Sequence, residues 1–214
     1  MRFALVNGIR TEPKKNIRGI CQCCGSEVIP KCGRFKVHHW AHKEKSACDP
    51  WWENESEWHR KWKSAFPESW QERLFKDPET QEKHIADIYS ESKDVAIEFQ
   101  SYQLKPDELL SREKFYKKLV WVVHGNKNES DRIYFGMSLH KPQTSDPSLY
   151  KISWFGRSKL FERWAYCKKK VYIDFGDDVL WHLIEYNPST KIGFLRTYKK
   201  SKFIQFFGGV ASAG

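Results

Sequence analysis

The sequence predicts an α/β protein in which helices flank a mixed sheet and a small cysteine-rich β module comes first. Four of the six cysteines fall within residues 21–32, in a stretch punctuated by glycine and proline. Residues 84–89 and 95–100 are short segments with a turn between them, as in a strand hairpin. Residues 119–123 (LVWVV) are apolar throughout, which is typical of a strand buried on both faces. Together these patterns indicate a sheet that follows a separate N-terminal module.

Composition narrows the class of protein further. Hydrophobic residues make up 40% of the chain and charged residues 30%, a balance typical of a soluble globular protein. No apolar run approaches the roughly 20 residues needed to cross a bilayer. The first residues, MRFALVNGIRTEP, turn polar too soon for a secretory signal. We therefore expect a cytoplasmic protein without membrane contact.

The positive charge is unevenly distributed along the chain. The net charge is +10. Residues 1–48 hold ten Lys/Arg against three Asp/Glu, and residues 151–214 hold twelve against five. Residues 49–150 hold fifteen against nineteen. An acidic middle between basic ends fits a cation-gathering centre beside regions that hold a phosphate backbone. The alternative is that the basic ends only solubilise the protein.

Local signals place the elements in order. Helices are predicted at 53–66, from Pro106 to about 118, and in the second half of 151–170. A loop with a helical turn is predicted at 67–78. Strands are predicted at 84–89, 95–100, 119–123, 132–139, 171–175 and 179–185. The predicted domains are an N-terminal module at 1–48, a core at 49–140, a basic C-terminal α/β region at 141–207 and a flexible tail at 208–214.

The N-terminal module has the spacing of a zinc site. Cys21-x2-Cys24 and His39-x2-His42 supply two thiolates and two imidazoles, which can close a tetrahedral shell around zinc. So small a module gains folding energy from a bound metal. Other side chains nearby can replace a ligand; these are Cys23, Cys32, His38 and Cys48. The alternative is a reduced cysteine cluster packed as small hydrophobes. That alternative leaves the paired spacing unexplained.

The predicted hairpin carries carboxylates. Alternation puts Ala96, Glu98 and Gln100 on one face of the second strand, and folding about residues 92–93 places Asp87 opposite Glu98. Two carboxylates in such contact repel one another unless a cation lies between them. Magnesium prefers such oxygen ligands, and it can ionise a bound water and stabilise an attacked phosphate. The alternative is an ordinary exposed hairpin with scattered carboxylates.

Two helical rows flank this hairpin. Glu55, His59 and Lys63 follow one another at helical spacing, so Glu55 is a candidate third carboxylate. Arg112 and Tyr116 are likewise four residues apart, and they can meet a phosphate together. For both rows the competing interpretation is a polar helix face with no ligand.

These residues resemble the competence protein CoiA-like family. The resemblance covers about residues 15–125 and, more loosely, 170–185. It is carried by Cys21-Gln-Cys-Cys24-Gly, His39-Trp-Ala-His42, Glu55-Ser-x2-His59-x3-Lys63, Ile85-Ala-Asp87-Ile, Ile97-Glu98-Phe-Gln100, Arg112-x3-Tyr116 and Trp121-Val-Val. It implies a restriction-endonuclease-like fold of the PD-(D/E)XK superfamily. His84 stands where arginine is expected and Tyr102 where serine is expected.

The resemblance implies a magnesium- or manganese-dependent nuclease acting on DNA, in competence, recombination or defence against foreign DNA. Its catalytic residues would be Asp87, Glu98, Gln100 and Glu55, with structural zinc in the N-terminal module. His59, Lys63, Arg112 and Tyr116 are the candidates for nucleic-acid contact. The competing hypothesis is a non-catalytic zinc-containing adaptor that binds nucleic acid. RNA as substrate, a protein partner and a homodimer all remain compatible with the sequence.

Overall fold

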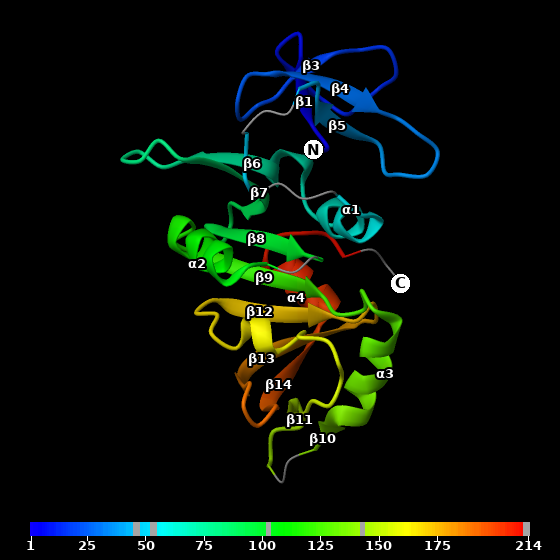
Figure 1. The fold of residues 1–214 in the computed structure, drawn as a ribbon, viewed down its shortest axis with the longest axis vertical. Coiled ribbons are helices and arrows are strands. Elements are labelled where there is room, and N and C mark those ends of the chain that lie inside the picture. Colours follow the sequence, from blue (N-terminus) through cyan, green and yellow to red (C-terminus); the bar gives the residue numbers. More distant parts are fainter. Residues whose placement is uncertain (45–47, 52–54, 102–103, 142–143, 212–214) are drawn as a thin grey trace. The chain divides into compact units, whose positions relative to one another are not determined.

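The computed structural model describes residues 1–44, 48–51, 55–101, 104–141 and 144–211. It divides into two compact units, Met1–Tyr89 and Ser90–Gly214, coloured blue to green and green to red in Figure 1. The division therefore falls inside the segment 49–140 that the sequence predicts as one core. Tyr102 lies outside the described residues.

The first unit begins with a small antiparallel sheet in the order β2-β1-β3-β4-β5. Its strands are β1 (Ala4–Val6), β2 (Ile9–Thr11), β3 (Gly19–Ile20), β4 (Glu27–Lys31) and β5 (His39–His42). Asn7 and Gly8 turn the first hairpin with φ angles of 51° and 79°, which an Asn-Gly turn of this kind requires. The buried ring of Trp40 and the side chains of Val28 and Ala4 form its core.

A helix and a second hairpin complete the first unit. Helix α1 (Glu57–Ser64) begins at a capping box in which Ser56 and His59 bond each other's backbone N–H. The 3-10 turn η1 (Glu68–Trp70) leads into β6 (Gln71–Lys76), which pairs antiparallel with β7 (Lys83–Ser90). Strand β7 confirms the predicted strand at 84–89. Strand β6 lies where the sequence predicts only a loop with a helical turn.

The N-terminal sheet packs against this second hairpin. Leu74 of β6 and Ile85 of β7 pack on the buried core around Trp40. The Asp49 carboxylate accepts a hydrogen bond from the Ile85 N–H at 2.9 Å and bonds His84 Nδ1 at 2.9 Å. These long-range contacts explain why the first unit extends through β7 and does not end near residue 48.

The second unit holds a mixed sheet in the order β10-β11-β14-β13-β12-β9-β8. Its elements are β8 (Val95–Gln100), α2 (Pro106–Phe115), β9 (Leu119–His124), α3 (Glu129–Ser138), β10 (Leu139–His140), β11 (Leu149–Ser153), η2 (Glu162–Trp164), β12 (Lys170–Asp174), β13 (Val179–Asn187), β14 (Ile192–Lys199) and α4 (Lys200–Phe206). Strand β9 runs parallel to β8 and to β12, and the remaining pairs are antiparallel. Helix α2 is the crossover between the parallel strands β8 and β9 (Figure 1).

Two predicted elements in this unit are wrong. Residues 132–139 were expected to form a strand, but helix α3 ends only at Ser138. Asp131, Phe135 and Ser138 are its buried residues, which is helical spacing, while Ile133 and Met137 are exposed. The helix expected within 151–170 is reduced to the short turn η2. Among the described residues no helix is both long and apolar enough to span a membrane.

Candidate functional site

The first candidate site is a cluster of three cysteines and a histidine in the N-terminal sheet. Cys21, Cys24, His42 and Cys48 each offer one ligand atom, and these atoms lie within 4.8 Å of one another. The Sγ atoms of Cys21 and Cys48 are 3.6 Å apart, and Cys24 Sγ lies 3.3 Å from His42 Nε2. A tetrahedron with Zn–S bonds of about 2.3 Å has edges of about 3.8 Å. This Cys3His cluster can therefore hold a structural metal ion such as zinc.

His39 is not part of this cluster. Its Nδ1 lies 2.8 Å from the carbonyl oxygen of Val37, and Cys48 supplies the fourth ligand atom that was predicted to come from His39. Both histidines of the HxxH pair lie on strand β5. Side chains three residues apart on a strand point to opposite faces, so His39 and His42 cannot share a ligand shell.

The thiols of the Cys3His cluster influence one another's protonation. A hydrogen bond from Cys48 is the largest effect on Cys21, and it lowers the pKa of Cys21 to about 4. Burial raises the pKa of the neighbouring thiol of Cys23, which is not among the ligand atoms. All six cysteines are free thiols. Burial alone would raise the pKa of Cys24, but hydrogen bonds from Ser26 and His42 lower it as well. The cluster thus favours thiolates, the form of cysteine that binds a metal.

The second candidate site is a group of carboxylates around the buried ammonium of Lys63, here called the Lys63 ring. Lys63 Nζ lies 2.8 Å from Asp87 Oδ1, 3.3 Å from Glu55 Oε1 and 3.3 Å from Glu72 Oε1. The side chains of Lys63 and Glu55 are each 5% exposed. The ring thus joins Asp87 and Glu55, the catalytic candidates of this unit, to Glu72, which sequence reasoning missed.

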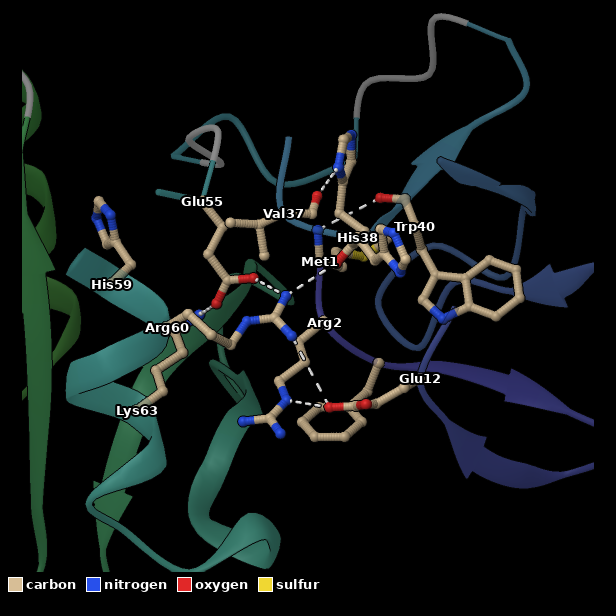
Figure 2. A network of polar contacts seen from close by, with 12 residues as sticks. Met1, Arg2, Glu12, Val37, His38, Trp40, Glu55, His59, Arg60 and Lys63 are labelled. Atoms are coloured by element: carbon tan, nitrogen blue, oxygen red, sulfur yellow. Dashed lines mark hydrogen bonds and ion pairs between the residues drawn. The ribbon is translucent and has the colours of Figure 1, made fainter. Parts of the chain in front are cut away.

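The same ring is anchored by the start of the chain and by Arg60. The backbone N–H groups of Arg2 and Phe3 donate to the two oxygens of Glu72 at 2.7 and 3.0 Å. Figure 2 shows the Arg60 guanidinium between Glu55 and Glu12, where it also donates to the carbonyl oxygen of His38 at 3.0 Å. Every carboxylate of the ring therefore has a basic or N–H partner supplied by the protein itself.

Electrostatic interactions within the ring offset the effect of burial on the pKa values of Lys63 and Glu72. Burial alone would lower the pKa of Lys63, but the carboxylates of Asp87, Glu72 and Glu55 raise it above its ordinary value. Burial alone would raise the pKa of Glu72, yet Lys63, the N-terminal ammonium and two backbone N–H groups lower it to about 2. Carboxylate oxygens are suitable ligands for magnesium, but a magnesium ion must compete here with Lys63.

The other two catalytic candidates lie in the second unit. Glu98 and Gln100 are on the fully buried strand β8, with exposures of 5% and 1%. Glu98 Oε2 accepts a hydrogen bond from Arg112 Nη1 at 3.3 Å, and the same guanidinium pairs with Glu108 one helical turn away. Asp87 belongs to the first unit, so its predicted position opposite Glu98 stays a prediction.

The four candidates for nucleic-acid contact are all buried. His59, Lys63, Arg112 and Tyr116 are 3–4% exposed. His59 caps its own helix through Ser56, while Lys63 and Arg112 are the ion-pair partners of the catalytic candidates Asp87 and Glu98. In this structure Lys63 and Arg112 therefore contact carboxylates, and none of the four buried side chains offers a surface to a phosphate.

Comparison with known proteins identifies the N-terminal part of the chain. Residues 10–50 match the family model described as the competence protein CoiA, N-terminal domain. The matched segment contains the complete Cys3His cluster. No curated protein and no solved structure matches the chain.

Proposed function

We propose, from the match of residues 10–50 to the CoiA N-terminal domain, that the chain is a metal-dependent nuclease of the competence protein CoiA-like family. The proposed fold is restriction-endonuclease-like, of the PD-(D/E)XK superfamily, and the proposed reaction is hydrolysis of DNA phosphodiester bonds. DNA uptake and defence against foreign DNA would both use this chemistry.

The observation that carries the proposal is that the carboxylates at the positions assigned to catalysis form ion pairs with buried cations. Asp87 and Glu55 are held by Lys63, and Glu98 is held by Arg112. Buried ion pairs seldom stabilise a fold more than apolar residues of similar size would. The ion pairs at these three positions therefore indicate a role other than stabilising the fold.

Each residue has a distinct proposed role. Asp87, Glu98 and Glu55 would be metal ligands, and the buried amide of Gln100 would orient a water molecule. Magnesium or manganese, when bound, would supply the charge that ionises this water and stabilises the attacked phosphate. Zinc in the Cys3His cluster would stabilise the N-terminal sheet, because a shell of four protein ligands leaves no open position for catalysis.

A metal-dependence assay tests the proposal. Purified protein is incubated with linear, circular, single-stranded and branched DNA, with and without magnesium or manganese. The variants are Asp87→Asn and Glu98→Gln, with Glu79→Gln as a matched control because Glu79 is exposed. We expect metal-dependent cleavage that falls at least about 100-fold in both site variants and persists in the control. Thermal melting verifies that each variant is folded.

A second candidate function is a non-catalytic adaptor that binds nucleic acid. The observation that favours it is the ion pairing of Asp87 and Glu55 with Lys63, whose ammonium occupies the space between these carboxylates that a metal ion would need. This candidate predicts salt-dependent DNA or RNA binding that Asp87→Asn leaves unchanged, with no cleavage of any DNA form. Fluorescence anisotropy on the same variants separates the two functions.

A further inference from the structure

The second unit contains a cavity of about 350 Å³ that lies next to Gln100. Gln100 at the end of β8 and its partner Val123 near the end of β9 both line it. The first helical residue of α2, Pro106, and the N-cap of α3, Asn128, line it as well. Ligands of α/β sheets usually bind beyond the carboxyl ends of parallel strands, and helix N-termini favour anions.

The charged residues that line this cavity are mostly basic. Lys127, Lys159 and Arg163 line it, against the single carboxylate of Asp131. Burial lowers the pKa of Arg163, and within the described part of the chain its guanidinium makes no hydrogen bond or ion pair. This differs from the Lys63 ring, where each cation has a carboxylate partner. Arg163 thus brings to the cavity a positive charge that no ion pair with a described residue offsets.

Two hydroxyl groups in the same cavity have no hydrogen-bond partner among the described residues. These are the buried Oγ atoms of Ser101 and Ser158. Ser101 is 9% exposed, so bulk water does not readily solvate it. A buried hydroxyl without a hydrogen-bond partner is energetically unfavourable. Two such groups beside the guanidinium of Arg163 indicate a ligand that carries both negative charge and hydrogen-bond acceptors.

We propose that this cavity binds a nucleoside monophosphate unit, with its phosphate on Lys159, Arg163 and the two serine hydroxyls. The volume lies near the lower end of the range of about 300–1,000 Å³ for small-molecule sites, which suits one nucleotide better than a longer strand. Leu104, Leu109 and Trp164 supply an apolar wall for a base or sugar. Because the cavity lies beside Gln100, it would receive the end of a DNA strand, and in this respect the inference rests on the proposed nuclease function.

Isothermal titration of the full chain with dTMP and with thymidine tests the cavity directly. Neither compound contains a phosphodiester bond, so the result is independent of nuclease activity. We expect dTMP to bind and thymidine to bind at least about tenfold more weakly. Arg163→Gln should weaken dTMP binding about tenfold or more. Arg157→Gln should change it less than about twofold, because Arg157 is exposed and does not line the cavity.

Ser101→Ala provides a second variant that should fold as well as the wild type. The Ser101 hydroxyl has no hydrogen-bond partner among the described residues. Its removal should therefore leave the melting temperature unchanged or slightly raised. The same variant should bind dTMP more weakly. Equal binding of dTMP and thymidine would overturn the proposal. Equal weakening by Arg163→Gln and Arg157→Gln would also overturn it, since that result indicates surface charge alone.

Oligonucleotides distinguish the source of the nucleotide. A single strand ending in a phosphate should bind more tightly than the same strand ending in a hydroxyl, and Arg163→Gln should abolish the difference. If dTMP binds through Arg163 but strand ends do not compete with it, the ligand is a free nucleotide. If the protein binds dTMP through Arg163 but cuts no DNA, the nuclease function is rejected and the nucleotide-binding role of the cavity is supported. If the protein cuts DNA with a metal ion but does not bind dTMP, the nuclease function is supported and the role of the cavity is rejected.

Discussion

The Cys3His cluster and the Lys63 ring both belong to the first unit, and they bring together mutually repelling groups in different ways. In the Lys63 ring, an ammonium from helix α1 lies among three carboxylates and offsets part of their negative charge. In the Cys3His cluster, the ligand atoms approach within 4.8 Å of one another in the arrangement that a metal ion requires. The comparison indicates that one cluster carries its own cation, whereas the other is built for a cation that must be bound.

The largest expected effect is loss of metal from the Cys3His cluster. We expect the wild type to hold one zinc ion per chain, and Cys48→Ser to lose tight binding and unfold the N-terminal sheet. Structural zinc contributes about 10–16 kcal/mol to the folding of small zinc-finger peptides, so the loss should be severe. Zinc content by mass spectrometry and amide hydrogen exchange of residues 1–48 measure both effects.

Two matched variants sharpen this test. His39→Ala and Cys32→Ser should both retain zinc, because neither residue belongs to the cluster. If His39→Ala lost zinc as completely as Cys48→Ser, the ligand set derived from the structure would be incorrect and the set expected from sequence spacing would be restored.

The next effect concerns the built-in cation of the Lys63 ring. Lys63→Met leaves two buried carboxylate side chains, Glu55 and Glu72, and the partly exposed Asp87 without their shared partner. Removing one partner of a buried ion pair typically destabilises a protein by about 3–5 kcal/mol. Lys61→Met, an exposed position on the same helix, should change the free energy of unfolding by less than about 0.5 kcal/mol. Urea unfolding measures both values.

Adding magnesium or calcium to the Lys63→Met variant tests whether the Lys63 ring differs from the Cys3His cluster in having no place for a bound metal ion. If a divalent ion raises the urea midpoint of this variant and not that of the wild type, the ring is a metal site that Lys63 blocks. If the ions change neither midpoint, the ring is a closed ion-pair network, and the proposed metal-binding role of Asp87 and Glu55 is weakened.

The strands and helices that the sequence predicted best are those with strong local signals. Strand β8 occupies the predicted residues 95–100, and helix α2 begins at the predicted Pro106. Helix α3 was missed because its apolar residues Ile133 and Met137 are exposed, so hydrophobicity did not mark the buried face. Periodicity reports burial only when the buried residues are apolar.

The candidate sites were predictable where spacing alone determines the geometry. Cys21 and Cys24 come together through one turn, as the CxxC spacing predicts. Cys48 could be named only as one alternative ligand, because no short spacing motif such as CxxC links it to the other ligands. Glu72 was missed because its contact with Lys63 depends on how β6 packs beside α1, and no local pattern encodes that packing.

The smallest of the three effects is acid destabilisation through Glu72. The pKa of this carboxyl is lowered in the folded protein from its ordinary 4.5 to about 2. Its contribution, roughly 3 kcal/mol, should be fully present above about pH 4.5 and lost as the pH falls toward 2. Glu72→Gln should remove it at neutral pH and flatten stability between these values. The exposed Glu79→Gln should retain the wild-type slope in urea unfolding, and equal slopes in all three proteins would show that the ring does not depend on an ionised Glu72.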